Sequence, residues 1–268
     1  MRAAVVQMCS TDDLAANLKA AEGFVRDAAQ AGADLVALPE NFAFLRREGR
    51  PVPCRQPVDG EIVGTVRAWA RELGLWILAG TFPEIVPGDP ERFHNTSVLV
   101  SAGGEVAGVY RKIHLFDVDL ASQGGEAYRE SATVAPGDEV VVADTPFGGL
   151  GLSVCYDLRF PELYRRMAER DARFLAVPSA FTPHTGKDHW EVLLRARAIE
   201  NQAFVLAPAQ AGRHGPERAS YGRSLIVDPW GLVLAQAADR PGVILADCRL
   251  EDLERIRGAL PALAHRRI

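Results

Sequence analysis

Hydrophobic residues along the chain occur in two spacings, and the spacing predicts the secondary structure. Short apolar runs bounded by proline, glycine or polar residues are typical of buried strands. We predict strands at residues 3–8, 35–38, 75–80, 96–100, 105–110, 140–143, 150–154, 174–177, 203–207, 225–227, 233–235 and 243–246. Apolar residues three or four positions apart predict amphipathic helices. We predict these at residues 12–31, 60–73, 161–170, 186–202 and 250–260.

The order of these segments predicts the fold class. Strands and helices alternate in both halves of the chain, and turns at residues 102–104 and 228–231 connect neighbouring strands as hairpins. Thr11 or Asp12 is expected to cap the first helix. The alternation favours an α/β architecture, most simply two mixed sheets with helices outside them. No low-complexity linker and no repeat of fixed period divides the sequence, so we expect a single domain over residues 1–268.

Composition and charge narrow the class of protein. The 268 residues are 48% hydrophobic, which suffices for one large core, and the net charge of −5 argues against a nucleic-acid partner. No apolar run approaches the ~18 residues of a membrane span. Residues 1–9 have the pattern of a strand rather than of a signal peptide. The four cysteines, Cys9, Cys54, Cys155 and Cys248, form no CxxC pair, which favours a reducing, cytoplasmic setting without a disulfide framework or a zinc site.

Cys155 has the most informative surroundings of the four cysteines. It ends the apolar run at residues 150–154 and stands just before a helix that begins at Pro161 and Glu162. A thiol at the carboxyl end of a strand, beside the amides of a helical turn, can act as a nucleophile on a rigid base. The alternative is a structural thiol, because free cysteines are usually buried.

Glu40 and Lys112 also follow predicted strands. Glu40 comes directly after Pro39, where partial burial would raise the pKa of its carboxyl group and suit it to proton transfer. A capping or salt-bridged glutamate is the other interpretation. Lys112 is one of only three lysines among 30 cationic side chains, and its ammonium can stabilise a thiolate and a developing oxyanion. A surface lysine beside Asp117 is the competing interpretation.

The six histidines give weaker signals. None stands in a motif that requires a metal or a cysteine–histidine pair. His184 and His189 are five positions apart, so they do not share one face of a helix. We therefore expect no metal site, and the nucleophilic chemistry considered for Cys155 requires no organic cofactor. A redox-sensing Cys155 would need a resolving cysteine nearby in the sequence, and none is present.

Three segments together resemble the signatures of the nitrilase, or carbon-nitrogen hydrolase, superfamily. They are LPENF around Glu40, YRKIHLFD around Lys112 and CYDLRFPE at Cys155, in the expected order. The resemblance implies an α-β-β-α sandwich that forms a homodimer through an outer helical layer. It also implies a triad in which Glu40 is the general base, Lys112 stabilises the oxyanion and the thiolate and donates a proton, and Cys155 is the nucleophile. Glu130, in YRES, matches the family's supporting second glutamate.

Further segments, at residues 189–202, 219–231 and 260–267, are similar to the branch that hydrolyses deaminated glutathione. The implied function is hydrolysis of a linear carboxamide through a cysteine thioester, with release of ammonia and deaminated glutathione as the substrate. The alternatives are omega-amidase activity on alpha-ketoglutaramate, hydrolysis of N-carbamoyl amino acids, and a non-catalytic binding or scaffold role. Arg223 stands where either amidase branch is expected to have histidine.

The residues expected to bind an anionic amide lie just after the nucleophile and near the polar segment 182–187. Arg159 offers a planar guanidinium group to a substrate carboxylate. A structural bridge from Arg159 to Glu162 or Asp157 is the alternative. The predicted substrate-binding set is Tyr156, Arg159, Phe181, Thr182 and Thr185.

Overall fold

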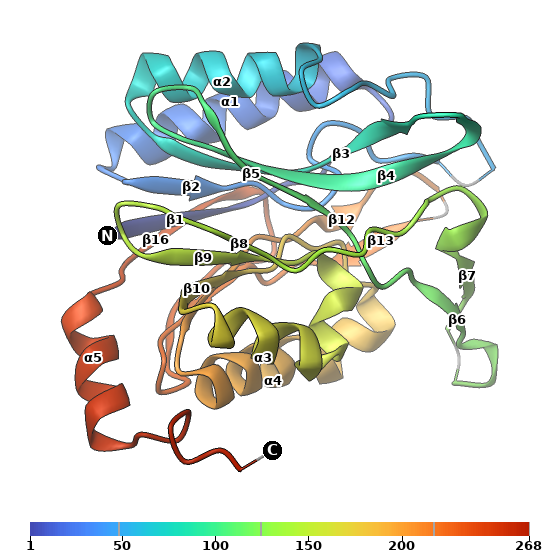
Figure 1. Cartoon of the computed structure of the whole chain (residues 1–268). Coiled ribbons are helices and arrows are strands. Elements are labelled where there is room, and N and C mark those ends of the chain that lie inside the picture. Colours follow the sequence, from blue (N-terminus) through green and yellow to red (C-terminus); the bar gives the residue numbers. More distant parts are fainter. Residues whose placement is uncertain (48, 124, 217, 268) are drawn as a thin grey trace.

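The chain folds into four layers, with two stacked sheets between pairs of helices (Figure 1). The computed structural model describes residues 1–47, 49–123, 125–216 and 218–267. Helices α1 and α2 cover one sheet, α3 and α4 cover the other, and α5 lies at one side of the sandwich near the C-terminal end. The predicted α-β-β-α class is confirmed. The helices are α1 (Leu14–Gln30), α2 (Glu61–Leu73), α3 (Pro161–Glu169), α4 (Pro183–Asn201) and α5 (Leu250–Ala259).

Each large sheet has six strands. The first contains β1 (Arg2–Gln7), β2 (Leu35–Ala37), β3 (Trp76–Val86), β4 (Asp89–Val100), β5 (Val106–Arg111) and β16 (Gly242–Asp247). The second contains β8 (Val141–Ala143), β9 (Gly149–Leu152), β10 (Ala172–Ala176), β11 (Phe204–Ala207), β14 (Leu225–Val227) and β15 (Val233–Gln236). Two small hairpins complete the strands: β6 (Asp117–Asp119) with β7 (Ala127–Arg129), and β12 (Ala211–Arg213) with β13 (Ala219–Tyr221).

The two large sheets share one plan. Their strand orders are β16-β1-β2-β3-β4-β5 and β15-β14-β11-β10-β9-β8. In each sheet three adjacent strands run parallel, β1-β2-β3 in one and β9-β10-β11 in the other, and the remaining pairs are antiparallel. Both sheets are therefore mixed, as predicted.

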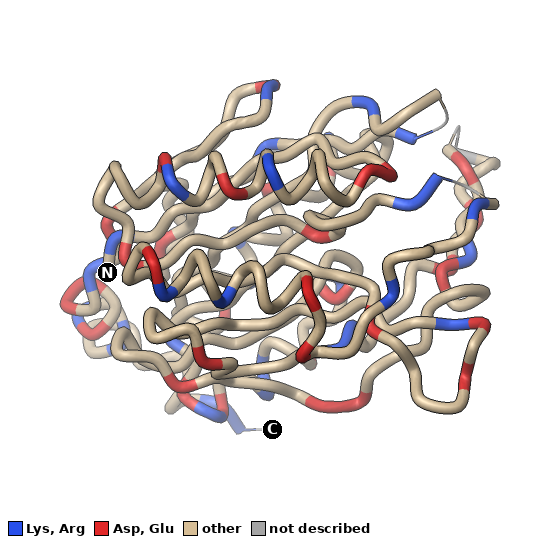
Figure 2. The backbone as a smooth tube through the Cα atoms, turned by 90° about the horizontal axis from the view of Figure 1, so that it is seen from above, with Lys and Arg blue, Asp and Glu red and all other residues tan. Residues whose placement is uncertain are grey.

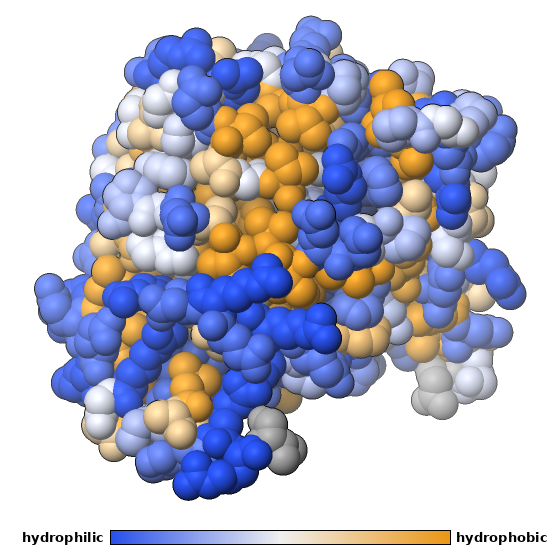
Figure 3. Space-filling view, viewed as in Figure 1, coloured by the Kyte–Doolittle hydropathy of each residue, from blue (hydrophilic) through white to orange (hydrophobic). Residues whose placement is uncertain are grey.

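Alternating side chains of β1 show how the layers are held together. Ala3 and Val5 belong to the core between the two sheets, whereas Ala4 and Val6 belong to the core beneath α1 and α2. A strand buried on both faces has no polar positions to alternate with, which explains its continuous apolar sequence. On the face seen in Figure 1, hydrophobic side chains also gather near the centre, where the edges of the two sheets lie, above a mostly hydrophilic lower part (Figure 3).

Two local predictions are wrong. Asp13, rather than Thr11 or Asp12, caps α1, because its carboxylate accepts a hydrogen bond from the Ala16 amide at 3.0 Å. The hairpin β3–β4 also extends well beyond the predicted strands. Its additional residues include Glu84, which is buried and pairs with the Arg111 guanidinium at 2.6 Å. A buried carboxylate in a strand interrupts the apolar pattern, so the strands predicted from that pattern are too short.

Charged residues of both signs are interspersed along the backbone (Figure 2). Several of them pair between elements. Arg26 of α1, for example, reaches Glu22 in its own helix and Glu72 of α2, each at 2.8 Å. Within the described ranges, no helix is both long and apolar enough to cross a membrane.

His214 is a buried histidine that should make stability depend on pH. Its Nδ1 lies 2.9 Å from the Ser10 carbonyl oxygen and its Nε2 lies 2.9 Å from Ser220 Oγ. Burial lowers the pKa of His214 to about 4. Because the ordinary pKa is ~6.5 in the unfolded chain, folding is penalised progressively as the pH falls below that value. We expect a loss of about 3 kcal/mol in unfolding free energy, complete near pH 4.

The contribution of His214 can be isolated with His214→Asn, whose amide nitrogen can replace the Nδ1–H donor. Urea unfolding gives the unfolding free energy of both proteins. The excess of wild type over the variant should shrink or reverse as the pH falls from 7 to 4. A difference that stays constant over this range would contradict the assignment of a neutral His214.

Candidate functional site

One cavity collects the side chains that follow three different strands. Glu40 follows β2, Lys112 follows β5 and Cys155 follows β9, and all three line this cavity together with Glu130. The two sheets thus bring their strand ends to a common site. Residues that are far apart in the sequence become neighbours only through this stacking.

Glu40 is buried and fixed by its surroundings. Its Oε1 accepts hydrogen bonds from Asn95 Nδ2 at 2.9 Å and from Lys112 Nζ at 3.1 Å, and its backbone carbonyl accepts one from Gln210 Nε2 at 2.9 Å. Gly80 permits this turn, because a Cβ at that position would lie 1.9 Å from the Pro39 carbonyl oxygen. The carboxylate is therefore held in one orientation, as proton transfer requires.

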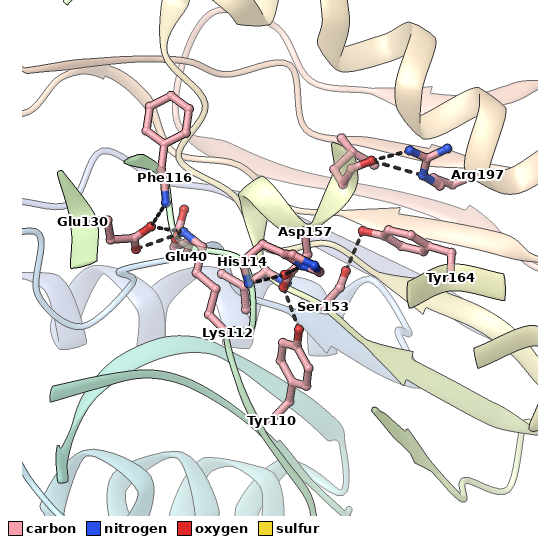
Figure 4. Close-up of polar contacts among 12 residues, drawn as sticks. Glu40, Tyr110, Lys112, His114, Phe116, Glu130, Ser153, Asp157, Tyr164 and Arg197 are labelled. Carbon is pink, nitrogen blue, oxygen red and sulfur yellow. Dashed lines mark hydrogen bonds and ion pairs between the residues drawn. The ribbon is translucent and has the colours of Figure 1, made fainter. Parts of the chain in front are cut away.

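Lys112 lies between two carboxylates (Figure 4). Its Nζ is 3.1 Å from Glu40 Oε1 and 2.9 Å and 2.8 Å from the two carboxylate oxygens of Glu130. Glu130 in turn accepts a hydrogen bond from the Phe116 amide at 2.7 Å. Burial by itself lowers the pKa of Lys112, but the negative charges of Glu130 and Glu40 outweigh that effect and hold the pKa well above its ordinary value. The ammonium therefore remains charged throughout the neutral pH range.

Cys155 begins the 3₁₀ turn η3 (Cys155–Arg159) with a left-handed backbone, at φ 50°. Such a conformation is strained for a residue with a side chain, and it aims the side chain out of the strand direction. The amide of Cys155 donates to the Pro178 carbonyl at 2.9 Å. The turn therefore presents the sulfur to the cavity from a fixed position.

Asp157 anchors this turn from inside the protein (Figure 4). Its fully buried carboxylate accepts hydrogen bonds from the Tyr110 hydroxyl at 2.7 Å and from the Val154 amide at 2.8 Å. It also accepts one from the backbone amide of His114 at 3.0 Å, and His114 Nδ1 lies 2.7 Å away. Because Tyr110 and His114 flank Lys112 in the sequence, Asp157 links the Cys155 turn to the lysine segment.

The resting form of Cys155 is a thiol. Burial raises its pKa most, the Glu40 carboxylate raises it further, and Lys112 and the Ala180 amide lower it only in part, so the pKa lies well above its ordinary value. This arrangement suits a nucleophile that loses its proton to a neighbouring base during attack, instead of a standing thiolate.

Removal of the Glu40 charge should therefore make Cys155 more reactive toward a simple alkylating agent. In Glu40→Gln protein the Lys112 ammonium remains while the carboxylate that raises the pKa of Cys155 is gone. At pH 7 we expect iodoacetamide to label Cys155 at least about 10-fold faster than in wild type, since one pKa unit changes the thiolate fraction tenfold. Peptide mass spectrometry gives the rate, and slower labelling of Cys155 would contradict this electrostatic account.

The cavity is large enough for a small metabolite, at about 990 Å³ including its open mouth. Tyr156, Phe181, Thr182 and Thr185 of the predicted substrate-binding set line it. Arg159 is not among its lining residues. Its guanidinium lies 5.7 Å and 5.6 Å from the ring centres of Tyr156 and Phe181, and its Nη1 is 3.3 Å from His189 Nδ1. Neither Glu162 nor Asp157 forms an ion pair with it among the described residues.

Several residues of the site had no sequence signal. Asn95 and Gln210, which hold Glu40, lie in segments whose strand pairing was not predicted. Three arginines also line the cavity, although nothing in the sequence around them indicated a place in the site. They are Arg46, Arg129 and Arg218.

Two further features of the sequence can be located in the structure: the arginine at position 223 and the side chains that could bind a metal. Arg223, the departure from the expected histidine, pairs with Asp239 at 2.9 Å and is not among the cavity-lining residues. In the described part of the chain, no three histidine, cysteine or acidic side chains are grouped as a metal would require.

Comparison with known proteins places this chain in a family. Residues 2–258 match the family model described as carbon-nitrogen hydrolase. A deaminated glutathione amidase from Synechocystis is 44% identical over 98% of this chain and 97% of its own length. One from Homo sapiens is 44% identical over 98% of this chain and 81% of its own length. The crystal structure of the NitFhit protein of Caenorhabditis elegans superimposes with a TM-score of 0.90 at 39% identity, covering 99% of this chain and 65% of that one. The chain therefore belongs to the carbon-nitrogen hydrolase family.

Proposed function

We propose that this protein is an amidase that hydrolyses a linear carboxamide through a thioester on Cys155, with deaminated glutathione as its substrate. The observation that carries the proposal is the buried cluster in which Lys112 lies between Glu40 and Glu130 in the cavity that Cys155 lines. The two relatives that are named deaminated glutathione amidases support the choice of substrate.

In the proposed acylation step, Glu40 accepts the thiol proton as the sulfur of Cys155 attacks the amide carbon. The Lys112 ammonium stabilises the oxyanion. The backbone N–H of Tyr156 is the second donor, because the first amides of a helical turn have no acceptor within the turn. One preorganised donor of this kind is typically worth ~3 kcal/mol of transition-state stabilisation. Glu40, or Lys112 with it, then returns a proton to the leaving nitrogen.

In the proposed deacylation step, Glu40 activates a water molecule that attacks the thioester carbon, and the sulfur leaves with the proton that restores the thiol. Glu130 is a positioning residue. Its two oxygens contact Lys112 Nζ, and the Phe116 amide fixes the carboxylate.

The chemistry of the substrate changes one expectation from the sequence. In deaminated glutathione the scissile amide joins an alpha-ketoglutaryl group to cysteinylglycine. The leaving group is therefore the dipeptide amine, and not ammonia. Ammonia is the product only from a primary amide such as alpha-ketoglutaramate.

A comparison of three amides tests the proposed function. Purified protein should show a higher kcat/KM for deaminated glutathione than for alpha-ketoglutaramate or an N-carbamoyl amino acid, with alpha-ketoglutarate and cysteinylglycine as products. A preference for alpha-ketoglutaramate would make the protein an omega-amidase. Inertness toward all three would contradict the proposal and favour a non-catalytic binding role.

We further propose a homodimer formed through α4 and the turn after β14. Val192 and Ile199 lie seven positions apart on one face of α4 and are 66% and 49% exposed. Beside them lie Trp230 and Leu232, 63% and 59% exposed, in a turn whose Gly231 carbonyl accepts a hydrogen bond from Arg195 of α4. A contiguous apolar face of this kind is typical of a subunit contact. Sedimentation should give a dimer for wild type and a monomer for Trp230→Glu; a monomeric wild type would contradict the proposal.

We propose a reducing, cytoplasmic location, because all four cysteines are free thiols and the proposed mechanism needs Cys155 reduced. The family match over residues 2–258 is consistent with the single domain expected for residues 1–268. Cell fractionation would test the location, and recovery of the protein in an oxidising compartment would contradict it.

A further inference from the structure

The cavity contains positive charge that the proposed reaction does not use. Arg46, Arg129 and Arg218 line it from three separate loops or strand ends. None of them forms an ion pair with another residue in the described part of the chain. Hydrogen bonds from Ser131 lower the pKa of the exposed Asp117 most, and the nearby charge of Arg129 lowers it further. An unpaired guanidinium beside a substrate cavity offers its planar fork to a carboxylate of the ligand.

Arg218 differs from the other two because it also lines a second hollow. This hollow adjoins the cavity, and the two share Tyr128, Thr182 and Arg218 as common lining. Arg213 and His184 line the second hollow as well.

The second hollow is basic on balance. Glu126 is its acidic residue among those described, and the Glu126 carboxylate already accepts a hydrogen bond from the Tyr128 hydroxyl at 2.7 Å. The two arginines of this hollow, Arg213 and Arg218, therefore exceed its negative charge.

The backbone of Arg218 is held in place. Its carbonyl oxygen accepts a hydrogen bond from the His214 amide at 2.9 Å, at the base of the hairpin that joins β12 and β13. The His214 ring is in turn fixed between Ser10 and Ser220. Arg218 therefore extends from an anchored loop into the wall between the two spaces.

We propose that Arg218 binds the carboxylate of the leaving amine, so that the enzyme selects amides whose nitrogen carries a carboxylate-bearing group. This inference rests on the proposed function, because the acyl half of the substrate must lie at Cys155. The leaving half then points away from Cys155, and the adjoining second hollow with its basic lining offers it a place beside Arg218. Arg46 and Arg129, which line only the first cavity, are left for the acyl half.

Two substrates with the same acyl group separate this role from a general effect. Deaminated glutathione and alpha-ketoglutaramate both form the alpha-ketoglutaryl thioester, but only the first has a leaving group with a carboxylate. Arg218→Met should lower kcat/KM for deaminated glutathione about 10- to 100-fold, the range for loss of a charge-assisted hydrogen bond, mainly through KM. For alpha-ketoglutaramate the change should stay below about 3-fold. Equal losses for both substrates, or no loss for either, would overturn the inference.

A binding measurement keeps this test independent of turnover. Calorimetric titration with deaminated glutathione is carried out on Cys155→Ala protein and on the Cys155→Ala/Arg218→Met double variant. Affinity should fall about 10-fold or more in the double variant, and equal affinities would overturn the inference even if the amidase proposal holds. Weaker binding without any wild-type turnover would refute the amidase proposal but retain the role of Arg218 in binding.

Arg47→Met is the matched control for both experiments. Arg47 is an exposed arginine paired with Asp12 at 2.8 Å, and it lines neither hollow. The control should match wild type with both substrates. A loss as large as that of Arg218→Met would show that the effect reflects net charge alone and would overturn the inference.

Discussion

Cys155→Ala protein is expected to lose amidase turnover by at least about 10⁵-fold while keeping its fold. Loss of a covalent nucleophile removes the acylation route altogether, and effects of this size are typical of such residues. The substitution deletes one sulfur atom from a residue that is 9% exposed at the edge of a cavity. Only a small cavity is left behind, so we expect a change in unfolding free energy of no more than about 1–2 kcal/mol.

The control for this substitution is Cys54→Ala, which removes a thiol that does not line the cavity. Its turnover should equal that of wild type. Circular dichroism and thermal unfolding should show that both variants are folded. Residual turnover of even a few per cent in pure Cys155→Ala protein would refute the role of Cys155 as nucleophile.

Lys112→Met protein should lose both activity and stability. Lys112 is 2% exposed, and its removal leaves Glu40 and Glu130 facing each other without the cation that now lies between them. Breaking a buried ion pair from one side typically costs about 3–5 kcal/mol. Loss of an oxyanion donor costs a further ~10²- to 10³-fold in kcat. Turnover assays and urea unfolding measure the two effects separately.

The stability loss of Lys112→Met should depend on pH. Without the cation, the two facing carboxylates repel each other and are poorly hydrated, and this penalty exists only while both carry charge. The folded state of the variant is therefore destabilised as the pH rises and both carboxylates become charged. Its deficit in unfolding free energy relative to wild type should be larger at pH 8 than at pH 5.

Lys187→Met is a control for Lys112→Met, because Lys187 is exposed and lies outside the cavity. A second substitution, Glu130→Gln, should restore part of the stability of Lys112→Met without restoring turnover. Stability that is unchanged in Lys112→Met would contradict the buried cluster.

The layered architecture was predictable because the central strands of both large sheets are buried on both faces. Runs such as those in β1, β2 and β11 are continuously apolar, and the helices between them have one apolar face. The extended part of β3–β4 was not predictable in the same way. Its buried Glu84 is stabilised by Arg111 from the neighbouring strand, a partner that only the folded sheet provides.

The sequence predicted the central residues of the site but not the residues that surround them. Glu40, Lys112 and Cys155 each stand within two residues of the end of an apolar run, so their place at strand ends could be predicted from the local sequence. Arg218, in contrast, reaches the cavity through a hairpin that the sequence pattern did not indicate. For Arg159 the sequence indicated closeness to the nucleophile but not its packing against Tyr156 and Phe181, and its contact with substrate stays a prediction.

The most direct test of the account is the identity of the covalent intermediate. Wild-type protein turning over deaminated glutathione is quenched in acid within milliseconds and digested, and the peptides are analysed by mass spectrometry. The account predicts an alpha-ketoglutaryl group on Cys155 and on no other residue, with none in Cys155→Ala protein treated in parallel. An acyl group on a different side chain, or turnover that persists in Cys155→Ala, would contradict it.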